Sequence, residues 1–208
     1  MDYRRTKYCP ELIDVPQKKK EVEALVKAEH PYAKDMHGYI SDNSQKFKLE
    51  FIKAYNGKCA YCGASNDLIK KTEFEIDHFL YEKAPIFATK KEAGYIQNLI
   101  LACHDCNHDK NSFWIKKEEF EELNPDGEKI KNVFIRDEQY YIRINDKFKH
   151  NTTIEEFYKK LHLGSELHRL DYLIMNIIGL QRSCQNNSDL YVGLGKILDI
   201  IRQKRNIM

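Results

Sequence analysis

The chain has 208 residues, of which 42% are hydrophobic, and 34 Lys and Arg stand against 32 Asp and Glu. This length fits one domain of ordinary size or a small module with flanking segments. The formal net charge of +2 excludes an overtly polybasic nucleic-acid binder, although it leaves a local basic face open. The hydrophobic content is too high for a chain that is disordered throughout.

The N-terminus and the cysteines predict the compartment. Residues 1–5, MDYRR, lack the apolar segment of a secretory signal, and no run of 18 apolar residues indicates a membrane span. We therefore expect a cytoplasmic protein with no membrane partner. In a reducing compartment, the spacing of the six cysteines points to metal or redox use before disulfides.

The N-terminal third contains two helical patterns. Pro10 and Pro16 with few periodic apolar residues predict an extended arm at the start of the chain. Apolar residues at helical spacing then predict helices over 17–30 and 41–55. Residues 1–58 are therefore expected to form an arm and helices.

The central part changes to short apolar runs between Cys, His and Asn residues. Alternating polar and apolar residues predict a strand over 72–77, and the apolar run 99–102 predicts a second strand. A helix is expected to start close to Cys106. Residues 59–115 are therefore expected to form the central core of the chain.

The C-terminal part, residues 116–208, is predicted to form a hairpin followed by helices. A turn signal at 124–127 precedes two strand patterns around Asp137. Thr153 with Glu156 three positions later resembles a capping box that opens a helix. Two further helices are expected over 165–181 and 188–204, and we interpret this region as a packing or partner surface.

Two C-x-x-C pairs are the strongest motif of the chain. Cys59 and Cys62 form one pair, and Cys103 and Cys106 form the other. Four thiolates in two short turns are most simply the ligands of one tetrahedral zinc ion. The forty residues between the pairs exceed the usual zinc-ribbon gap of about 15 to 20, so a further unit is inserted there. A site with four protein ligands has no open position, so this zinc is expected to be structural.

Other interpretations of these cysteines are weaker. A redox dithiol would require a C-x-x-C at the start of a helix in a βαβ context, which the pattern does not show. His104 or His108 could replace a cysteine as ligand, although four thiolates make neither necessary.

The segment between and after the pairs carries an ordered set of polar residues. Asp77 and His78 end the first predicted strand, Asn98 precedes the second, Asn107 follows the second cysteine pair, and Lys110 comes one helical turn later. With the cysteine pairs, this order resembles the HNH endonuclease family over about 60 residues, from Cys59 to about Ser112. The resemblance implies a ββα-metal fold, so the whole chain is expected to be α+β, mostly helical around a central ββα-metal core with a four-cysteine zinc site and a small C-terminal hairpin.

The resemblance also assigns roles to these residues. His78 is the candidate general base, because a neutral imidazole can take a proton from water near pH 7. Asp77 and Asn107 offer hard oxygen ligands to a catalytic Mg²⁺ or Mn²⁺. Asn98 is expected to brace the loop that orients the histidine, and Lys110 is expected to approach a phosphate oxygen. Many family members have a histidine where this chain has Asn107, which leaves the preferred ion open.

Several basic residues are candidates for contacts with the substrate. Two lysine pairs and one histidine lie in or next to the inserted segment: Lys70, Lys71, Lys90, Lys91 and His108. Nevertheless, residues 59–115 carry six lysines against eight acidic residues, a net charge of −2. Long-range attraction to DNA comes from Lys and Arg, so it is expected to be weak here. Tight DNA binding should then depend on the flanking segments, on self-association or on a partner subunit.

The layout as a whole resembles the small HNH subunits of bacterial anti-phage defence systems of the Septu type, in which the nuclease accompanies an ATPase. The sequence thus predicts a metal-dependent DNA endonuclease of such a complex. Three alternatives stay open: an HNH scaffold that has lost activity, a non-catalytic zinc module that binds nucleic acid or protein, and an RNA-directed nuclease.

Overall fold

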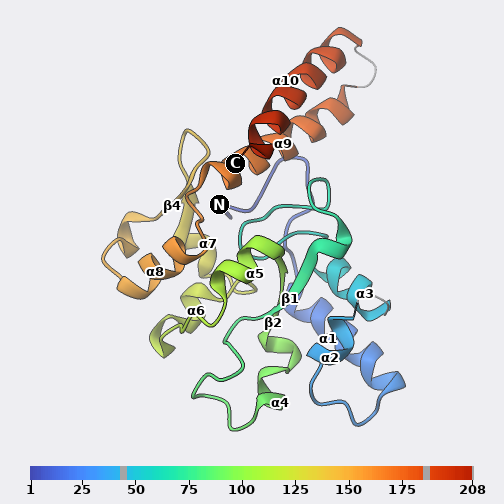
Figure 1. Cartoon of the computed structure of the whole chain (residues 1–208), viewed down its shortest axis with the longest axis vertical. Coiled ribbons are helices and arrows are strands. Elements are labelled where there is room, and N and C mark those ends of the chain that lie inside the picture. Colours follow the sequence, from blue (N-terminus) through green and yellow to red (C-terminus); the bar gives the residue numbers. More distant parts are fainter. Residues whose placement is uncertain (43–45, 185–187, 208) are drawn as a thin grey trace.

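The computed structural model describes residues 1–42, 46–184 and 188–207 (Figure 1). Its centre is an antiparallel pair of strands, β1 (Phe74–His78) and β2 (Leu99–Cys103), followed at once by helix α5 (His104–Lys110). In the strand register His78 faces Leu99. The two predicted strands and the helix after them are confirmed, and with them the α+β fold class.

The connection between β1 and β2 contains two short helical pieces, α4 (Lys90–Ala93) and η2 (Ile96–Asn98). A further 3-10 turn, η1 (Lys71–Glu73), leads into β1. Strand β1 begins two residues later than predicted, because residues 71–73 are wound into this turn.

Among the described residues, three helices precede the central unit: α1 (Val15–Glu29), α2 (His37–Ile40) and α3 (Lys46–Ala54). Helix α1 packs on α3. The two predicted N-terminal helices are confirmed in type. Residues 43–45 of the second predicted helix lie outside the described residues, and Ser41 belongs to the end of α2.

In the described residues of the C-terminal part, short helices lead into a small hairpin, which three longer helices follow. The short elements are η3 (Lys117–Glu119), α6 (Phe120–Leu123), α7 (Ile130–Val133) and η4 (Asp146–Phe148). Strands β3 (Phe134–Arg136) and β4 (Ile142–Ile144) form the predicted hairpin. Helices α8 (Thr152–Lys160), α9 (Glu166–Ser183) and α10 (Ser188–Asn206) follow. Helices α9 and α10 pack together and project from the body (Figure 1).

The start of α8 corrects one prediction. The N-cap is Asn151, whose side-chain oxygen accepts a hydrogen bond from the backbone N–H of Ile154 at 3.1 Å. Thr153 is buried inside the first turn. The predicted capping box of Thr153 and Glu156 is therefore wrong, since asparagine is at least as good an N-cap as threonine and stands two positions earlier.

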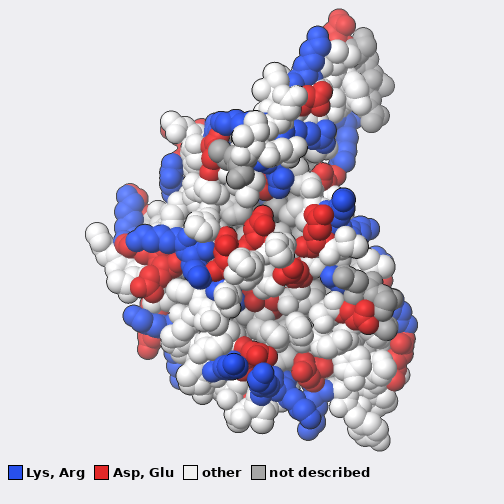
Figure 2. Space-filling view, viewed as in Figure 1, with Lys and Arg blue, Asp and Glu red and all other residues white. Residues whose placement is uncertain are grey.

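Charges are unevenly distributed on the face seen in Figure 2. Acidic side chains gather across the middle of this face, and most lysines and arginines lie toward its edges (Figure 2). Within the described residues, no helix is long and apolar enough to cross a membrane.

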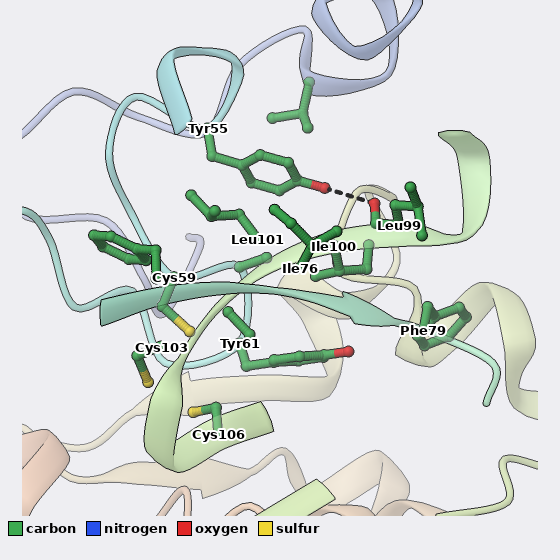
Figure 3. Close-up of a cluster of buried hydrophobic side chains, with 14 of the residues drawn as sticks. Tyr55, Cys59, Tyr61, Ile76, Phe79, Leu99, Ile100, Leu101, Cys103 and Cys106 are labelled. Carbon is green, nitrogen blue, oxygen red and sulfur yellow. Dashed lines mark hydrogen bonds between the residues drawn. The ribbon is translucent and has the colours of Figure 1, made fainter. Parts of the chain in front are cut away.

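One hydrophobic cluster joins all three regions of the chain. It runs from Tyr3 through the central strands to Leu163, and a smaller cluster holds α9 to α10 through Ile174, Ile178 and Leu198. Figure 3 shows the sheet lying between Tyr55 on one side and Tyr61 on the other. The predicted boundaries after residues 58 and 115 therefore cross one shared core, and they stay a prediction.

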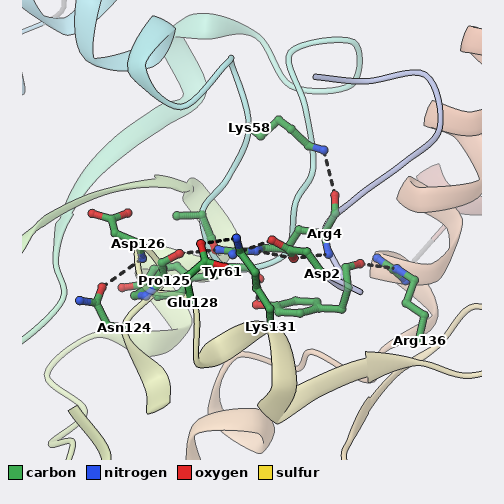
Figure 4. Close-up of polar contacts among 12 residues, drawn as sticks. Asp2, Arg4, Lys58, Tyr61, Asn124, Pro125, Asp126, Glu128, Lys131 and Arg136 are labelled. Carbon is green, nitrogen blue, oxygen red and sulfur yellow. Dashed lines mark hydrogen bonds and ion pairs between the residues drawn. The ribbon is translucent and has the colours of Figure 1, made fainter. Parts of the chain in front are cut away.

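The first residues of the chain are packed against the cysteine turn. The Arg4 guanidinium donates hydrogen bonds to the carbonyl oxygens of Ala60 at 2.6 Å and Pro125 at 2.8 Å (Figure 4). The Tyr3 hydroxyl donates to the carbonyl oxygen of Tyr61 at 2.6 Å, and Lys58 donates to that of Arg4 at 2.8 Å. The expected N-terminal arm is thus irregular in backbone but buried at Tyr3 and Arg4.

Candidate functional site

The four paired cysteines meet in one buried cluster. Their sulfur atoms all lie within 4.8 Å of one another, and the Cys62 and Cys103 sulfurs are 3.9 Å apart. A tetrahedral zinc with bonds of about 2.3 Å needs sulfurs about 3.8 Å apart, so the set fits this ion. Figure 3 shows the sulfurs of Cys59, Cys103 and Cys106 turned toward one another. Among the described residues, no other group of three or more His, Cys, Asp or Glu side chains is as close.

The backbone shapes the first cysteine turn. The backbone N–H of Gly63 donates to the carbonyl oxygen of Cys59 at 3.0 Å, and that of Ala60 donates to the Leu101 carbonyl at 2.8 Å. Gly63 has a φ of +81°, and a Cβ there would lie 2.8 Å from the Cβ of Arg4. Glycine is therefore required for both the backbone angle and the close approach of the N-terminal segment.

A pocket of about 650 Å³ lies where β1 ends beside α5. Asp77, His78 and Asn107 all line it, although 28 residues lie between His78 and Asn107 in the sequence. The other lining residues are Tyr81, Glu82, Lys83, His108, Asn111 and Ser112. The structure thus brings three of the five predicted catalytic residues, and His108, into one cavity.

Asp77 is buried and held by two donors. The Tyr61 hydroxyl donates to Oδ2 at 2.5 Å, and the Lys110 ammonium lies 3.0 Å from Oδ1 and 2.9 Å from Oδ2. Burial raises the pKa of Asp77 above its ordinary value, while Lys110 and the Tyr61 hydrogen bond oppose that rise. Each carboxylate oxygen has two lone pairs, so Asp77 keeps acceptor capacity toward the pocket.

Lys110 lies elsewhere than the sequence predicts. Its side chain is fully buried, and its ammonium also donates to the carbonyl oxygen of His78 at 2.8 Å. The helix therefore presents this lysine to Asp77 and to the end of β1, and the expected approach to a phosphate oxygen is not what this structure shows. A buried ammonium needs a charged partner, and Asp77 supplies it.

His78 is half-buried at the end of β1, and its ring stacks on that of His37 at 4.5 Å between centroids. A ring nitrogen of His37, Nε2, lies 3.2 Å from the carbonyl oxygen of Ile76. Burial, followed by the neighbouring His37, lowers the pKa of His78 to about 4. The imidazole is therefore neutral near pH 7 and can accept a proton.

Asn98 ties the loop after His78 to the start of β2. Its side-chain oxygen accepts from the backbone N–H of Leu80 at 2.9 Å, and its Nδ2 donates to the carbonyl oxygens of Leu80 at 2.9 Å and Ala93 at 2.8 Å. All three hydrogen bonds go to backbone atoms of Leu80 and Ala93, so Asn98 holds the loop in place. Neither Leu80 nor Ala93 lines the pocket.

Asn107 is bound to a carboxylate that the sequence analysis left without a role. The Asn107 Nδ2 donates to Oε2 of Glu75 at 2.5 Å, and Nδ1 of His104 lies 2.7 Å from Oε1. Burial raises the pKa of Glu75, but the hydrogen bonds from His104 and Asn107 outweigh it, so the pKa is lower than usual. Glu75 is therefore ionised near pH 7.

The lysine pairs proposed for substrate contact do not line the pocket. Lys70 and Lys71 precede β1, at the end opposite His78, and both are exposed. Lys90 forms an ion pair at 3.1 Å with Glu82, which does line the pocket, and Lys91 lies on the same short helix α4. Lys83 is the lysine that lines the pocket with an exposed side chain.

Sequence reasoning missed four residues around the site: His37, Tyr61, Glu75 and Lys83. Two of them carried a usable signal. Glu75 stands two positions before Asp77 on a strand, which puts both side chains on one face. Tyr61 stands inside the first cysteine pair. His37 comes from a separate helix and could not be placed from its sequence context.

The comparisons with known proteins agree with this geometry. Residues 59–113 match the family model described as HNH endonuclease. Neither the curated proteins nor the solved structures contain a significant match to the chain. The matched segment includes the four cysteines of the cluster, β1, β2 and α5. It also includes Asp77, His78 and Asn107, which line the pocket. Residues 59–113 are therefore an HNH endonuclease domain, which supports a nuclease-type function.

Proposed function

We propose that this protein is a metal-dependent endonuclease that hydrolyses phosphodiester bonds in DNA. The observation that carries the proposal is that Asp77, His78 and Asn107 line one pocket inside the HNH domain. Hydrolysis of a phosphodiester needs oxygen ligands for a metal ion and a base for the attacking water. Asp77 and Asn107 offer the ligands and His78 offers the base in one open cavity.

Asp77 and Asn107 are the residues that would hold the catalytic metal. Both offer oxygen atoms, which suit Mg²⁺ or Mn²⁺ better than a softer ion. When bound, such an ion withdraws electron density from the phosphate and stabilises the departing oxygen. The buried Lys110 and the Tyr61 hydroxyl hold the Asp77 carboxylate in place for this task.

His78 is the proposed general base. Its neutral ring takes a proton from a water molecule as the water oxygen attacks phosphorus. The bond to the 3′ oxygen breaks, and this oxygen takes a proton from solvent to become a hydroxyl. The products that the family resemblance implies are a 3′-hydroxyl and a 5′-phosphate. Asn98 keeps the loop behind His78 in place, and Lys83 can contact the phosphate backbone from the pocket edge.

The four-cysteine cluster is proposed to hold a structural zinc. All four sulfurs are buried, and none of the cysteines of the described residues forms a disulfide. Zinc thiolates require reduced cysteines, so we place the protein in the cytoplasm.

We further propose that an ATPase subunit accompanies this nuclease in anti-phage defence, as the Septu-like layout suggests. Two observations support a partner. Residues 59–115 have a net charge of −2, so the domain attracts DNA weakly. Helix α10 also exposes large apolar side chains: Leu190, Tyr191, Val192, Ile197 and Ile200. Co-purification with an ATPase supports the proposal; a stable homodimer alone, or salt-resistant DNA binding by the isolated chain, contradicts it.

Plasmid cleavage with purified protein tests the central proposal. We expect Mg²⁺- or Mn²⁺-dependent cutting that His78→Ala reduces at least about 100-fold, the usual contribution of a general base. His150→Ala removes an exposed histidine outside the pocket and is the matched control with unchanged cutting. Zinc content and thermal unfolding show that both variants fold.

Three results would change this assignment. Full cutting by His78→Ala contradicts the role of the histidine. Preference for RNA over DNA in the same assay would make the protein an RNA-directed nuclease. Absence of cutting with and without the co-purified partner would favour a non-catalytic zinc module.

A further inference from the structure

Glu75 and Asp77 alternate with Phe74, Ile76 and His78 along β1. Residues two apart on a strand point to the same face, so Glu75 and Asp77 share one. Helix α5 packs on β1. His104 and Asn107 are three positions apart on α5, so they lie on one side of that helix and can reach the same carboxylate.

Both oxygens of Glu75 are occupied by these two helix residues. Oε1 lies 2.7 Å from Nδ1 of His104, and Oε2 accepts from Nδ2 of Asn107 at 2.5 Å. These two contacts fix the position of the Glu75 side chain. It is 37% exposed, so it is not part of the hydrophobic core. Glu75 does not line the pocket that Asn107 lines.

The chemistry of the two groups sets the direction of the Asn107 amide. An ionised carboxylate only accepts hydrogen bonds, whereas an amide has a donor end and an acceptor end. The NH₂ end of Asn107 must therefore face Glu75, and the oxygen is turned to the other side. Only the oxygen end of an amide can bind Mg²⁺ or Mn²⁺.

We propose that Glu75 is a positioning residue that fixes the orientation of the Asn107 amide, so that the amide oxygen is available to the catalytic metal. This inference rests on the proposed metal site of Asp77 and Asn107 and adds to it a second carboxylate that never touches the ion. Partners of metal ligands that fix the ligand in this way contribute about 10- to 100-fold to metal affinity.

Glu75→Gln tests whether Glu75 fixes the orientation of the Asn107 amide, and it changes the side-chain volume little. A glutamine can either accept from Nδ2 or donate to Oδ1 of Asn107, so both amide directions become available. The readout is the dissociation constant for Mn²⁺ of the zinc-loaded protein, measured from free Mn²⁺ by electron paramagnetic resonance. We expect Glu75→Gln to weaken binding by about 10-fold. Half-saturation of cleavage by Mg²⁺ should rise in parallel, with the rate recovering at high Mg²⁺.

Glu73→Gln is the matched control for charge. Glu73 is exposed, stands two residues before Glu75, and makes one long hydrogen bond of 3.4 Å to the backbone of Lys70. Its replacement removes the same charge without touching Asn107. We expect Mn²⁺ affinity within about twofold of wild type; an equal loss in both variants would show that net charge, and not the amide direction, is responsible.

A double-mutant cycle with Asn107→Ala separates this inference from the proposed function. If Glu75 acts through Asn107, Glu75→Gln adds no further loss of Mn²⁺ affinity once Asn107 is alanine. A full additive loss overturns the positioning role. An unchanged affinity in Asn107→Ala alone overturns the metal site itself, whereas a loss there with none in Glu75→Gln overturns only the role of Glu75.

Discussion

His168 is a buried residue whose ring is only half satisfied. Nε2 lies 3.3 Å from the carbonyl oxygen of Leu161, and Nδ1 has no hydrogen-bond partner among the described residues. Burial lowers the pKa of His168 below its ordinary value, although the nearby Asp171 opposes the shift. The folded state therefore keeps this ring neutral, while the unfolded chain binds a proton near pH 6.5.

This histidine makes stability depend on pH. Because the folded pKa is lowered, its contribution is fully present above about pH 6.5 and falls as the pH drops below that value. We expect the free energy of unfolding of the wild type to fall by up to about 1.4 kcal/mol per pH unit more than that of His168→Gln between pH 6.5 and 5.5. Urea unfolding of both proteins at each pH checks this. Parallel curves would show that His168 titrates alike in the folded and unfolded chain.

At the scale of elements, helix α1 is joined to the rest by a buried ion pair. Lys19 lies 2.5 Å from Asp126 Oδ2 and 3.2 Å from the carbonyl oxygen of Gln97. The Tyr55 hydroxyl donates to the other oxygen of Asp126 at 2.8 Å. The pair therefore connects α1, the residue directly after α3 and the turn at 124–127.

Removing one member of this pair leaves an uncompensated buried charge. We expect Lys19→Met to lower the free energy of unfolding by about 3 kcal/mol, as for other broken buried pairs. Lys20→Met, at the exposed neighbouring position, should change it by less than about 0.5 kcal/mol. Adding Asp126→Asn to Lys19→Met should recover part of the loss. Equal stability of the two single variants in urea would contradict the structural role of the pair.

At the scale of the whole molecule, the cysteine cluster joins two segments that are far apart in sequence. Cys59 and Cys62 follow α3, whereas Cys103 ends β2 and Cys106 lies in the first turn of α5. Tyr61, between the first two cysteines, donates to Asp77 at 2.5 Å. Through Tyr61 the cluster therefore contacts Asp77, a residue that lines the pocket at the end of β1.

Zinc removal should consequently affect fold and pocket together. Binding free energy of a structural zinc is folding free energy, so chelation is expected to lower the midpoint of thermal unfolding by about 10 °C or more. Zinc should restore the midpoint and Mg²⁺ should not. Calorimetry and zinc analysis check this, with Cys184→Ser as the control outside the cluster. A chelated protein with an unchanged transition would show that the four thiols need no metal.

The central part of the fold was the most predictable. Two C-x-x-C pairs and short apolar runs between them located β1, β2 and α5, because metal-ligand spacing and strand alternation are local features. The start of α8 was less predictable, since Asn151 and Thr153 are both acceptable caps and packing buries the threonine. The pairing of Lys110 with Asp77 was not predictable, because it depends on which side of α5 faces β1.

The sequence by itself determined the residue types of the site and their order: four thiols, Asp77, His78, Asn98 and Asn107 in an HNH pattern. Only the tertiary structure decided what each charged group does. It buried Lys110 against Asp77, placed His37 on His78, and turned Asn107 to Glu75. The physical reason is that local patterns specify strands, turns and ligands, whereas the partner of a charge depends on which surfaces are brought together when distant segments pack.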